Sequence, residues 1–497
     1  MPSRCARVIK TLWEVWAEPL VETLGIHEPH DRSYGRCNVP FSPMEKRLHE
    51  KDDVEVSFHK VMLDNGKDWV WYQIWQDPVA IRQTGRNADM IFVHGTGVHS
   101  GTLASQCRRY LDAGFRLIVP DLPSHGFSSG LHVYQRDMSG FCAGLHSVLH
   151  DVSRRDHPIS PPTKLERRPT FMLGLSFGGL VAFSYALQYP SSYRFSLTDP
   201  TEIPIDGLIG VGPMVAYNTR FVVVSFWMRL LFLFLLHVFQ LGRLEVIVPH
   251  KRAVDRDPAV YESLIMQDPR SHQGAFRIGH LNCINNAMVQ LQRRAGEIRH
   301  PVYIQMGGQD KVADTDAALK WIRATSSKDR RYEVYPICQH VIYKKAKSQH
   351  DDLAGRISVI ADNVEWMVER APPSMPTQAV GDMGCERPER DGSDESGASM
   401  SRTTSVISLF DVDDDETGSV ATTALATPSL TDEESVAHAK AERSEMEVGG
   451  QSHVLPEHLR GWRTDEDGEK RLYRVTWNFK EDSRPFLYDP CPAPCSL

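Results

Sequence analysis

The sequence lacks an apolar leader, a framework of paired cysteines and a concentration of basic residues. It begins MPSRCARVIK, without the apolar core of a secretory signal. The 9 cysteines are odd in number and scattered. The pair of cysteines in CPAPC at 491–495 supplies only two ligands, whereas zinc needs four. The sequence also has no basic patch of the kind that binds nucleic acid. These absences predict a reduced, cytoplasmic setting with no metal, no cofactor and no nucleic-acid partner.

Aromatic side chains are nearly absent from a long acidic stretch, residues 371–450. It holds 17 Asp and Glu, 5 Lys and Arg, 19 Ser and Thr, and Phe410 as its one aromatic residue. Such a segment cannot bury enough apolar surface to offset its chain entropy, so we predict that it is disordered. RTTSVIS at 402–408 and SLTDEES at 429–435 are typical of kinase substrates, and a plain solvated spacer is an equal alternative. The stretch carries a net charge of −12 and the whole chain −8, so the rest of the chain carries about +4. The acidic balance therefore belongs to this stretch and not to the predicted folded body.

Short apolar runs alternate with helix-length segments from about residue 54 to residue 370. This rhythm predicts parallel strands joined by crossover helices, in an α/β fold with helices on both faces of a mostly parallel sheet. The first two runs alternate polar and apolar residues, as an antiparallel edge pair does, and the later ones are continuously apolar. The eight expected strands are VEVSFHKVML, DWVWYQIW, MIFVHG, FRLIVPD, TFMLGLS, GLIGVGP, PVYIQMGG and RYEVYP.

The rhythm also predicts the domain organisation. We expect an N-terminal arm (1–53), a first part of the core (54–213), a helical cap (214–300), a second part of the core (301–370), the acidic linker (371–450) and a C-terminal appendage (451–497). The arm carries an apolar stripe at helical spacing, which indicates packing or a membrane contact. In the appendage, RLYRVTWNF at 471–479 is a candidate strand that docks on the body.

The stretch GLSFGG at 174–179 places a serine between glycines, directly after an apolar run. A nucleophile on a tight strand-to-helix turn needs glycine two residues before and after it, because the turn crowds those positions. Ser176 is therefore the predicted nucleophile, flanked by Gly174 and Gly178. An ordinary glycine-rich bend is the alternative.

Three further segments offer the partners that a nucleophilic serine needs. HGTGVHSG follows the third expected strand, and Gly95 and Gly97 there allow amides to face an oxyanion; the expected donors are the amides of Thr96 and Phe177. The alternative is a glycine turn beside a buried His94.

The acid and the base are expected after the seventh and eighth strands. Asp310 follows a glycine turn and is the expected acid, whereas Asp314 is more typical of a helix N-cap. His340 lies 30 residues after Asp310 and is the expected base. His99 and His125 are expected to form loop hydrogen bonds.

These motifs carry a family resemblance. HGTGVHSG, DLPSHGFSSG, GLSFGGLVAF, GVGPMVAYN, GGQDKVAD and YPICQHVIYKK, in that order, resemble the monoacylglycerol lipase and lysophospholipase branch of the α/β-hydrolases. The resemblance runs from about Val54 to Arg370. It implies a serine hydrolase that cleaves fatty acyl esters of small lipids through an acyl-serine intermediate, with a helical cap over an acyl tunnel. Two departures are Phe177, which would narrow the tunnel, and Ser124, where the family commonly has glycine.

Other functions remain open on the same residues. An acyltransferase, a thioesterase or a short-chain carboxylesterase would use the same triad, and a catalytically silent lipid-binding scaffold would keep the fold alone.

The most apolar segment of the chain, residues 221–242, bears on the membrane question. As a helix it would reach about 33 Å, enough to span a bilayer. Ser176 precedes it and both partners follow it, so a single crossing would separate the triad. We expect a cap helix that rests on a membrane surface or a shallow hairpin; a cap packed on the sheet without lipid contact is the alternative. The expected location is peripheral, on an internal membrane or a lipid droplet.

Overall fold

The computed structural model describes most of the chain up to residue 373. The described residues are 4–29, 31–159, 163, 167–194, 203–220, 225–246, 268–272, 275–346 and 348–373, together with four short strands between 462 and 487. The predicted disorder and the two predicted kinase sites lie outside the described residues, apart from residues 371–373.

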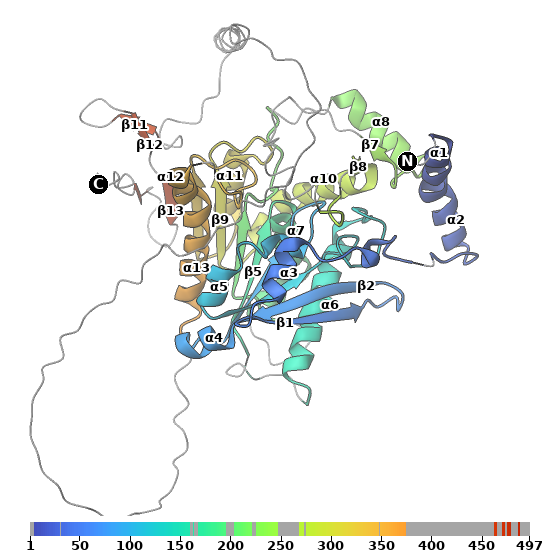
Figure 1. The fold of residues 1–497 in the computed structure, drawn as a ribbon. Coiled ribbons are helices and arrows are strands. Elements are labelled where there is room, and N and C mark those ends of the chain that lie inside the picture. Colours follow the sequence, from blue (N-terminus) through green and yellow to red (C-terminus); the bar gives the residue numbers. More distant parts are fainter. Residues whose placement is uncertain are drawn as a thin grey trace, which may run out of the picture. The chain divides into compact units, whose positions relative to one another are not determined.

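The sheet contains all eight predicted strands, in the order β1-β2-β4-β3-β5-β6-β9-β10. Figure 1 labels β1, β2, β5 and β9 among them. The strands are β1 (Glu55–Met62), β2 (Trp69–Gln76), β3 (Ala88–Val93), β4 (Phe115–Pro120), β5 (Thr170–Leu175), β6 (Gly207–Val211), β9 (Val302–Gly307) and β10 (Arg330–Tyr335). β2 pairs antiparallel with β1 and β4, and the strands from β4 to β10 are parallel. The predicted α/β architecture is confirmed.

Helices cover both faces of this sheet and bury its apolar side chains. One face packs against α6 (Met138–Asp156), α7 (Phe177–Gln188), α10 (Ile278–Arg293) and α11 (Thr315–Ala324), and the other against α5 (Arg108–Asp112) and α13 (Ser358–Arg370). β3, β4 and β9 are buried along their whole length, as their continuously apolar sequences require. The sheet thereby holds the ends of its parallel strands in fixed positions.

The segment between β6 and β9 contains α8 (Phe226–His237), the short antiparallel pair β7 (Glu245–Val246) and β8 (Phe276–Arg277), and α10. None of the 12 residues of α8 is buried, although most are apolar. Among the described helices, none combines the length and apolar character needed to cross a bilayer. Part of the apolar segment 221–242, residues 221–224, lies outside the described residues.

Segments before and after the core add to it. The N-terminal arm forms α1 (Arg4–Leu12), a π-helical turn (Trp13–Ala17) and α2 (Glu18–Thr23), followed by α3 (Pro43–His49). From the C-terminal segment, β13 (Val475–Asn478) pairs antiparallel with the edge strand β10, and β14 (Phe486–Leu487) pairs with β13. β11 (Trp462–Thr464) and β12 (Lys470–Leu472) form a separate pair. The C-terminal strands β13 and β14 therefore extend the sheet beyond β10.

Candidate active site

Ser176 lies on the tight turn between β5 and α7. Its backbone has φ 51° and ψ −112°, a conformation that non-glycine residues rarely adopt. A side-chain carbon at Gly178 would lie 1.9 Å from the Val93 carbonyl oxygen, and one at Gly174 would lie 2.3 Å from the Gly178 carbonyl oxygen. Only glycine fits at either position, so the turn depends on both residues that the sequence singled out.

Ser176, His340 and Asp310 form one hydrogen-bonded chain. The Oγ of Ser176 lies 2.7 Å from Nε2 of His340, and Nδ1 of His340 lies 2.8 Å from Oδ2 of Asp310. A neutral imidazole with its proton on Nδ1 satisfies both contacts, because Nδ1 then donates to the carboxylate and Nε2 accepts from the serine. The structure thus brings together three predicted residues from the carboxyl ends of β5, β9 and β10.

The Asp310 carboxylate is fixed by backbone amides. Its Oδ1 accepts hydrogen bonds from the amides of Val312 (2.8 Å) and Ala313 (2.9 Å), which leaves Oδ2 for His340. The side chain of Asn218 also donates to the Asp310 carbonyl oxygen at 3.1 Å. Because the carboxylate is fully buried and each oxygen has a separate task, the imidazole has one preferred orientation.

The alternative acid, Asp314, has the role that its sequence position predicted. It is the N-cap of α11, and its side chain accepts from the Ala317 amide at 2.8 Å. A nearby glycine allows the loop that carries His340 to approach closely: a side-chain carbon at Gly307 would lie 2.5 Å from the carbonyl oxygens of Cys338 and Gln339. The loop that carries His340 can therefore pack directly on the end of β9.

The loop after β3 lies beside the serine. A side-chain carbon at Gly95 would lie 3.8 Å from Cβ of Ser176, and Gly97 has a positive φ of 77°. In the described part of the chain, neither the Thr96 nor the Phe177 amide donates to a protein acceptor. Phe177 is the first residue of α7, where helix geometry supplies no acceptor. Both predicted donors are therefore free to bind an oxyanion.

His94 holds this loop from within the core. It is fully buried, its Nδ1 donates to the Gly95 carbonyl oxygen at 2.8 Å and its Nε2 accepts from the Leu122 amide at 2.9 Å. Burial lowers the pKa of His94 to about 4, so the ring is neutral at neutral pH. The buried His94 and the unpaired amide of Thr96 are thus compatible parts of one loop.

Asp121 is a supporting residue that the sequence prediction did not assign. Its carboxylate accepts from the amide (2.9 Å) and hydroxyl (2.7 Å) of Ser100 and from the amide of Phe127 (2.7 Å). It therefore ties the loop after β4 to the loop after β3. Its place directly after a buried strand, in the motif DLPSHG, was the available signal.

His99 and His125 make the predicted loop hydrogen bonds. The Nδ1 of His99 accepts from the Gly101 amide at 3.1 Å, and its Nε2 lies 2.5 Å from Oδ2 of Asp268. Nδ1 of His125 donates to the Pro123 carbonyl oxygen at 3.1 Å. Ser124, which departs from the family's glycine, has a positive φ of 66°. The family's glycine suits this conformation, whereas the serine adopts it with strain.

Phe177 points into the layer between α6 and α10. Its ring centroid lies 5.1 Å from that of Phe141 and 5.1 Å from that of His280, a residue that the sequence prediction missed. Burial lowers the pKa of His280 to about 3, so this ring is neutral at neutral pH. The chain has 21 histidines, and no sequence pattern distinguishes His280 from the others. Its contact with Phe177 is visible only in the packed structure. The effect of Phe177 on acyl length stays a prediction.

The strand order and the serine, histidine and aspartate at the strand ends define an α/β-hydrolase. Residues 85–345, just over half of the chain, match the Hydrolase_4 family, described as serine aminopeptidase, S33. The chain belongs to this family and is a serine ester hydrolase of the monoacylglycerol lipase branch.

Two relatives and one solved structure are similar to more than half of this chain. The monoacylglycerol lipase of Mycolicibacterium smegmatis is 23% identical over 302 residues, which cover 60% of this chain and 92% of that protein. The human monoglyceride lipase is 24% identical over 271 residues, covering 53% of this chain and 79% of that protein. A soluble variant of the Saccharomyces cerevisiae monoglyceride lipase, solved with a substrate analogue, has a TM-score of 0.49 at 19% identity and covers 65% and 96% of the two chains.

Proposed function

We propose that this protein hydrolyses fatty acyl esters of small lipids, such as monoacylglycerols or lysophospholipids, through an acyl-serine intermediate. The observation that carries the proposal is the chain of contacts from Ser176 through His340 to Asp310, at 2.7 Å and 2.8 Å, on a strained glycine-flanked turn. Names of the relatives, monoacylglycerol lipase and monoglyceride lipase, supply the substrate class.

In the proposed reaction, the Ser176 hydroxyl attacks the ester carbonyl while Nε2 of His340 takes its proton. The oxygen that becomes negative accepts from the amides of Thr96 and Phe177. His340 then gives its proton to the leaving alcohol, and the acyl group stays on Ser176 as an ester. Water attacks this ester with His340 as the base, which releases the fatty acid and restores the serine. Asp310 keeps the imidazole in the tautomer and orientation that both steps need.

The cap helix α8 supports a lipid substrate and a membrane contact. Its apolar side chains are exposed to solvent, with Phe226 67% and Trp227 77% exposed. A helix that is apolar on most sides and unburied within its own protein has the character of an interfacial segment. We infer that α8 rests on the surface of an internal membrane or lipid droplet, where ester substrates reside. Kinase action on the acidic linker stays a proposal from its sequence alone.

Replacing Ser176 by Ala tests the enzymatic proposal. We expect hydrolysis of a monoacylglycerol and of a water-soluble ester to fall by about 10⁶-fold, because no nucleophile remains. Ser184→Ala is the matched control, since Ser184 is a half-buried serine on α7, the helix that follows Ser176. Labelling by a fluorophosphonate probe must disappear in the first variant and persist in the second. A loss of less than tenfold would contradict the proposal.

A panel of lipid esters then defines the substrate. Monoacylglycerols, lysophospholipids, thioesters and short-chain esters are compared with the purified full chain. Added alcohol distinguishes hydrolysis from acyl transfer, because a transferase would form a new ester in place of free fatty acid. An active serine that releases acid only from short-chain esters would redirect the proposal toward a carboxylesterase.

A further inference from the structure

The N-terminal arm presents its apolar side chains to solvent instead of to the protein. Seven large apolar residues along α1 to α2 are between 43% and 62% exposed: Val8, Ile9, Leu12, Trp13, Trp16, Leu20 and Leu24. Val15 and Glu18 are buried instead. An ordinary surface helix packs its apolar stripe against the core. Here the stripe has no covering among the described residues, and polar contacts hold the opposite face.

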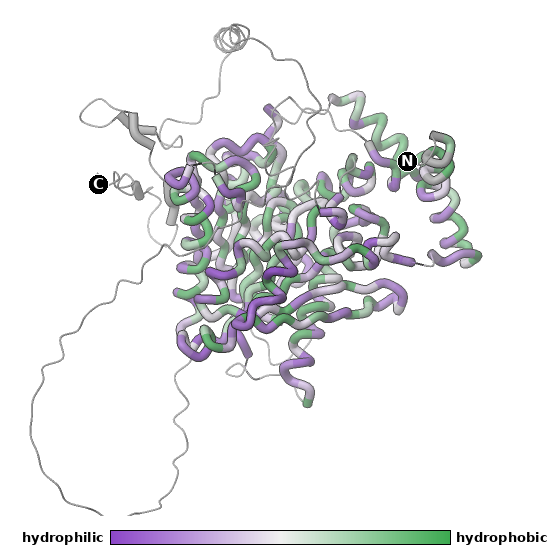
Figure 2. Tube along the Cα trace, viewed as in Figure 1, coloured by the Kyte–Doolittle hydropathy of each residue, from purple (hydrophilic) through white to green (hydrophobic). Residues whose placement is uncertain are grey.

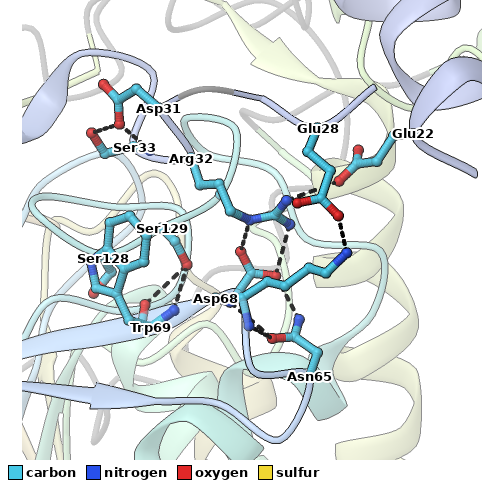
Figure 3. Close-up of polar contacts among 12 residues, drawn as sticks. Glu22, Glu28, Asp31, Arg32, Ser33, Asn65, Asp68, Trp69, Ser128 and Ser129 are labelled. Carbon is cyan, nitrogen blue, oxygen red and sulfur yellow. Dashed lines mark hydrogen bonds and ion pairs between the residues drawn. The ribbon is translucent and has the colours of Figure 1, made fainter. Parts of the chain in front are cut away.

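Ion pairs fix the inward face of the arm. Arg243, which follows α8, donates to Oε2 of Glu18 at 2.9 Å and to Oε2 of Glu22 at 3.3 Å. Tyr34 also donates to Glu18, at 2.9 Å. Figure 3 shows Arg32 between Glu22 and Asp68, where it bridges the arm to the start of β2. These contacts are partly buried, so they orient the arm more strongly than exposed pairs would.

The arm also contacts a residue that follows α8. The indole Nε1 of Trp16 donates to the Phe239 carbonyl oxygen at 3.1 Å. α8 and the residues that follow it expose a second set of apolar side chains, between 42% and 77%: Phe226, Trp227, Leu230, Leu231, Leu233, Phe234, Val238 and Phe239. In Figure 2 the apolar colouring is prominent along α8 and recurs along α1 and α2. We call the two sets together the arm–cap face.

The composition of this face fits a lipid surface. Three exposed tryptophans, Trp13, Trp16 and Trp227, are of the residue type that concentrates at membrane interfaces. α8 contains the exposed Arg229 and no acidic residue. The acidic Glu18 and Glu22 of the arm face inward, in ion pairs. Anionic head groups that contact α8 would therefore meet the exposed Arg229 and exposed aromatic side chains.

The face is linked to the active site through short packing steps. The amides of Ile278 and Gly279, at the start of α10, donate to the carbonyl oxygens of Leu244 and Gly242 at 2.9 Å and 2.8 Å. His280, the next residue of α10, packs on Phe177 beside the nucleophile. A bilayer that binds the face would thus lie against the same cap that borders the site.

We propose that the arm and α8 form one membrane-binding face, clamped together by Arg243, that docks on an anionic bilayer. The inference rests on the proposed function, since it supplies that enzyme with its lipid. It adds that residues 4–24, which lie outside the matched family region, contribute as much to docking as the cap does. Two interfacial segments joined by these contacts bind more tightly than either alone, because the second contact is intramolecular.

Vesicle flotation of the full chain tests the proposal. The vesicles are phosphatidylcholine with and without phosphatidylserine. The arm variant is Trp13→Ser, Trp16→Ser, Leu20→Ser and the cap variant is Trp227→Ser, Leu231→Ser, Phe234→Ser. The control, Val79→Ser with Val289→Ser, changes exposed apolar residues elsewhere. We expect arm and cap variants each to lower binding at least about tenfold, the control to match the parent, and phosphatidylserine to strengthen parent binding. Parent-like flotation of the arm variant would overturn the proposal.

A direct readout guards against misfolded variants. In a Trp227→Phe background, lipids with brominated acyl chains should quench tryptophan fluorescence, and Trp13→Phe with Trp16→Phe should remove this quenching while flotation persists. Arg243→Gln removes the clamp without touching an apolar side chain, and we expect several-fold weaker binding. Unchanged quenching in the Phe variant would overturn arm insertion.

Two further measurements separate the possible failures. Hydrolysis of a water-soluble ester should be the same in parent and arm variant, so an inactive parent that still floats would refute the enzyme and leave the docking face intact. Size-exclusion chromatography with light scattering tests whether a second copy of this chain, instead of a membrane, covers the face. A parent dimer that the arm variant converts to a monomer, without vesicle binding, would show that a second copy covers the face and would overturn the proposal.

Discussion

Replacing Asp310 by Asn is expected to remove activity while preserving the fold. The amide side chain of the variant keeps one carbonyl oxygen. This oxygen can still accept from the Val312 and Ala313 amides, which lie 2.8 Å and 2.9 Å from Oδ1 of Asp310 in the parent. Its NH₂ group then faces Nδ1 of His340, where the carboxylate lies at 2.8 Å. Two donors cannot share that contact, so the imidazole takes the tautomer with its proton on Nε2 and cannot accept from Ser176.

The size of the effect follows from this geometry. A wrong tautomer at an otherwise intact triad costs about 10⁴-fold in kcat. Asp310→Ala is the matched comparison, because it also leaves the partly buried Val312 amide and the buried Ala313 amide without an acceptor, and a buried amide so left costs about 1–3 kcal/mol. Hydrolysis of a water-soluble ester gives kcat, and urea unfolding gives stability. We expect both variants to lose activity and only the Ala variant to lose stability. An Asn variant that keeps more than a tenth of the parent kcat would refute the role of Asp310.

Two further predictions concern the turn and the buried histidine. Gly178→Ala should abolish activity and lower stability, because the new carbon would lie 1.9 Å from the Val93 carbonyl oxygen; parent-like kinetics and melting temperature would contradict this account of the turn. Burial lowers the pKa of His94 from 6.5 to about 4, so the unfolded chain binds the proton first as the pH falls. Its stabilising contribution is complete above pH 6.5 and is lost as the pH falls toward about 4, roughly 3 kcal/mol over that interval. Urea unfolding of parent and His94→Gln across this range checks the sign: equal pH slopes would be inconsistent with it.

The fold was predictable because its signals are local. Each parallel strand is an apolar run buried on both faces, so the strand positions followed from hydropathy, and chain order fixed which turn carried each polar residue. Asp310 and Asp314 were separable for the same reason, since one follows a strand and the other begins a helix.

Contacts between distant segments were not predictable. His280 touches Phe177 only because α10 packs on α7, and no spacing in the sequence encodes that contact. Likewise, Arg270 forms a buried ion pair with Glu45 from α3, and Arg243 reaches the arm, across more than 200 residues. Such pairs form only in the packed structure, and the sequence does not show which of its many charged residues will pair.

The site geometry also restricts how the apolar cap can meet a membrane. Ser176 precedes α8, and Asp310 and His340 follow it, yet the three side chains lie in hydrogen-bond contact. The two ends of the segment that contains α8 must therefore lie on the same side of any bilayer. α8, at 12 residues, is about 18 Å long, too short to cross a hydrocarbon core of about 30 Å. A helix in the interface satisfies both conditions, and a second interfacial helix clamped beside it would hold the cap against the lipid without any crossing.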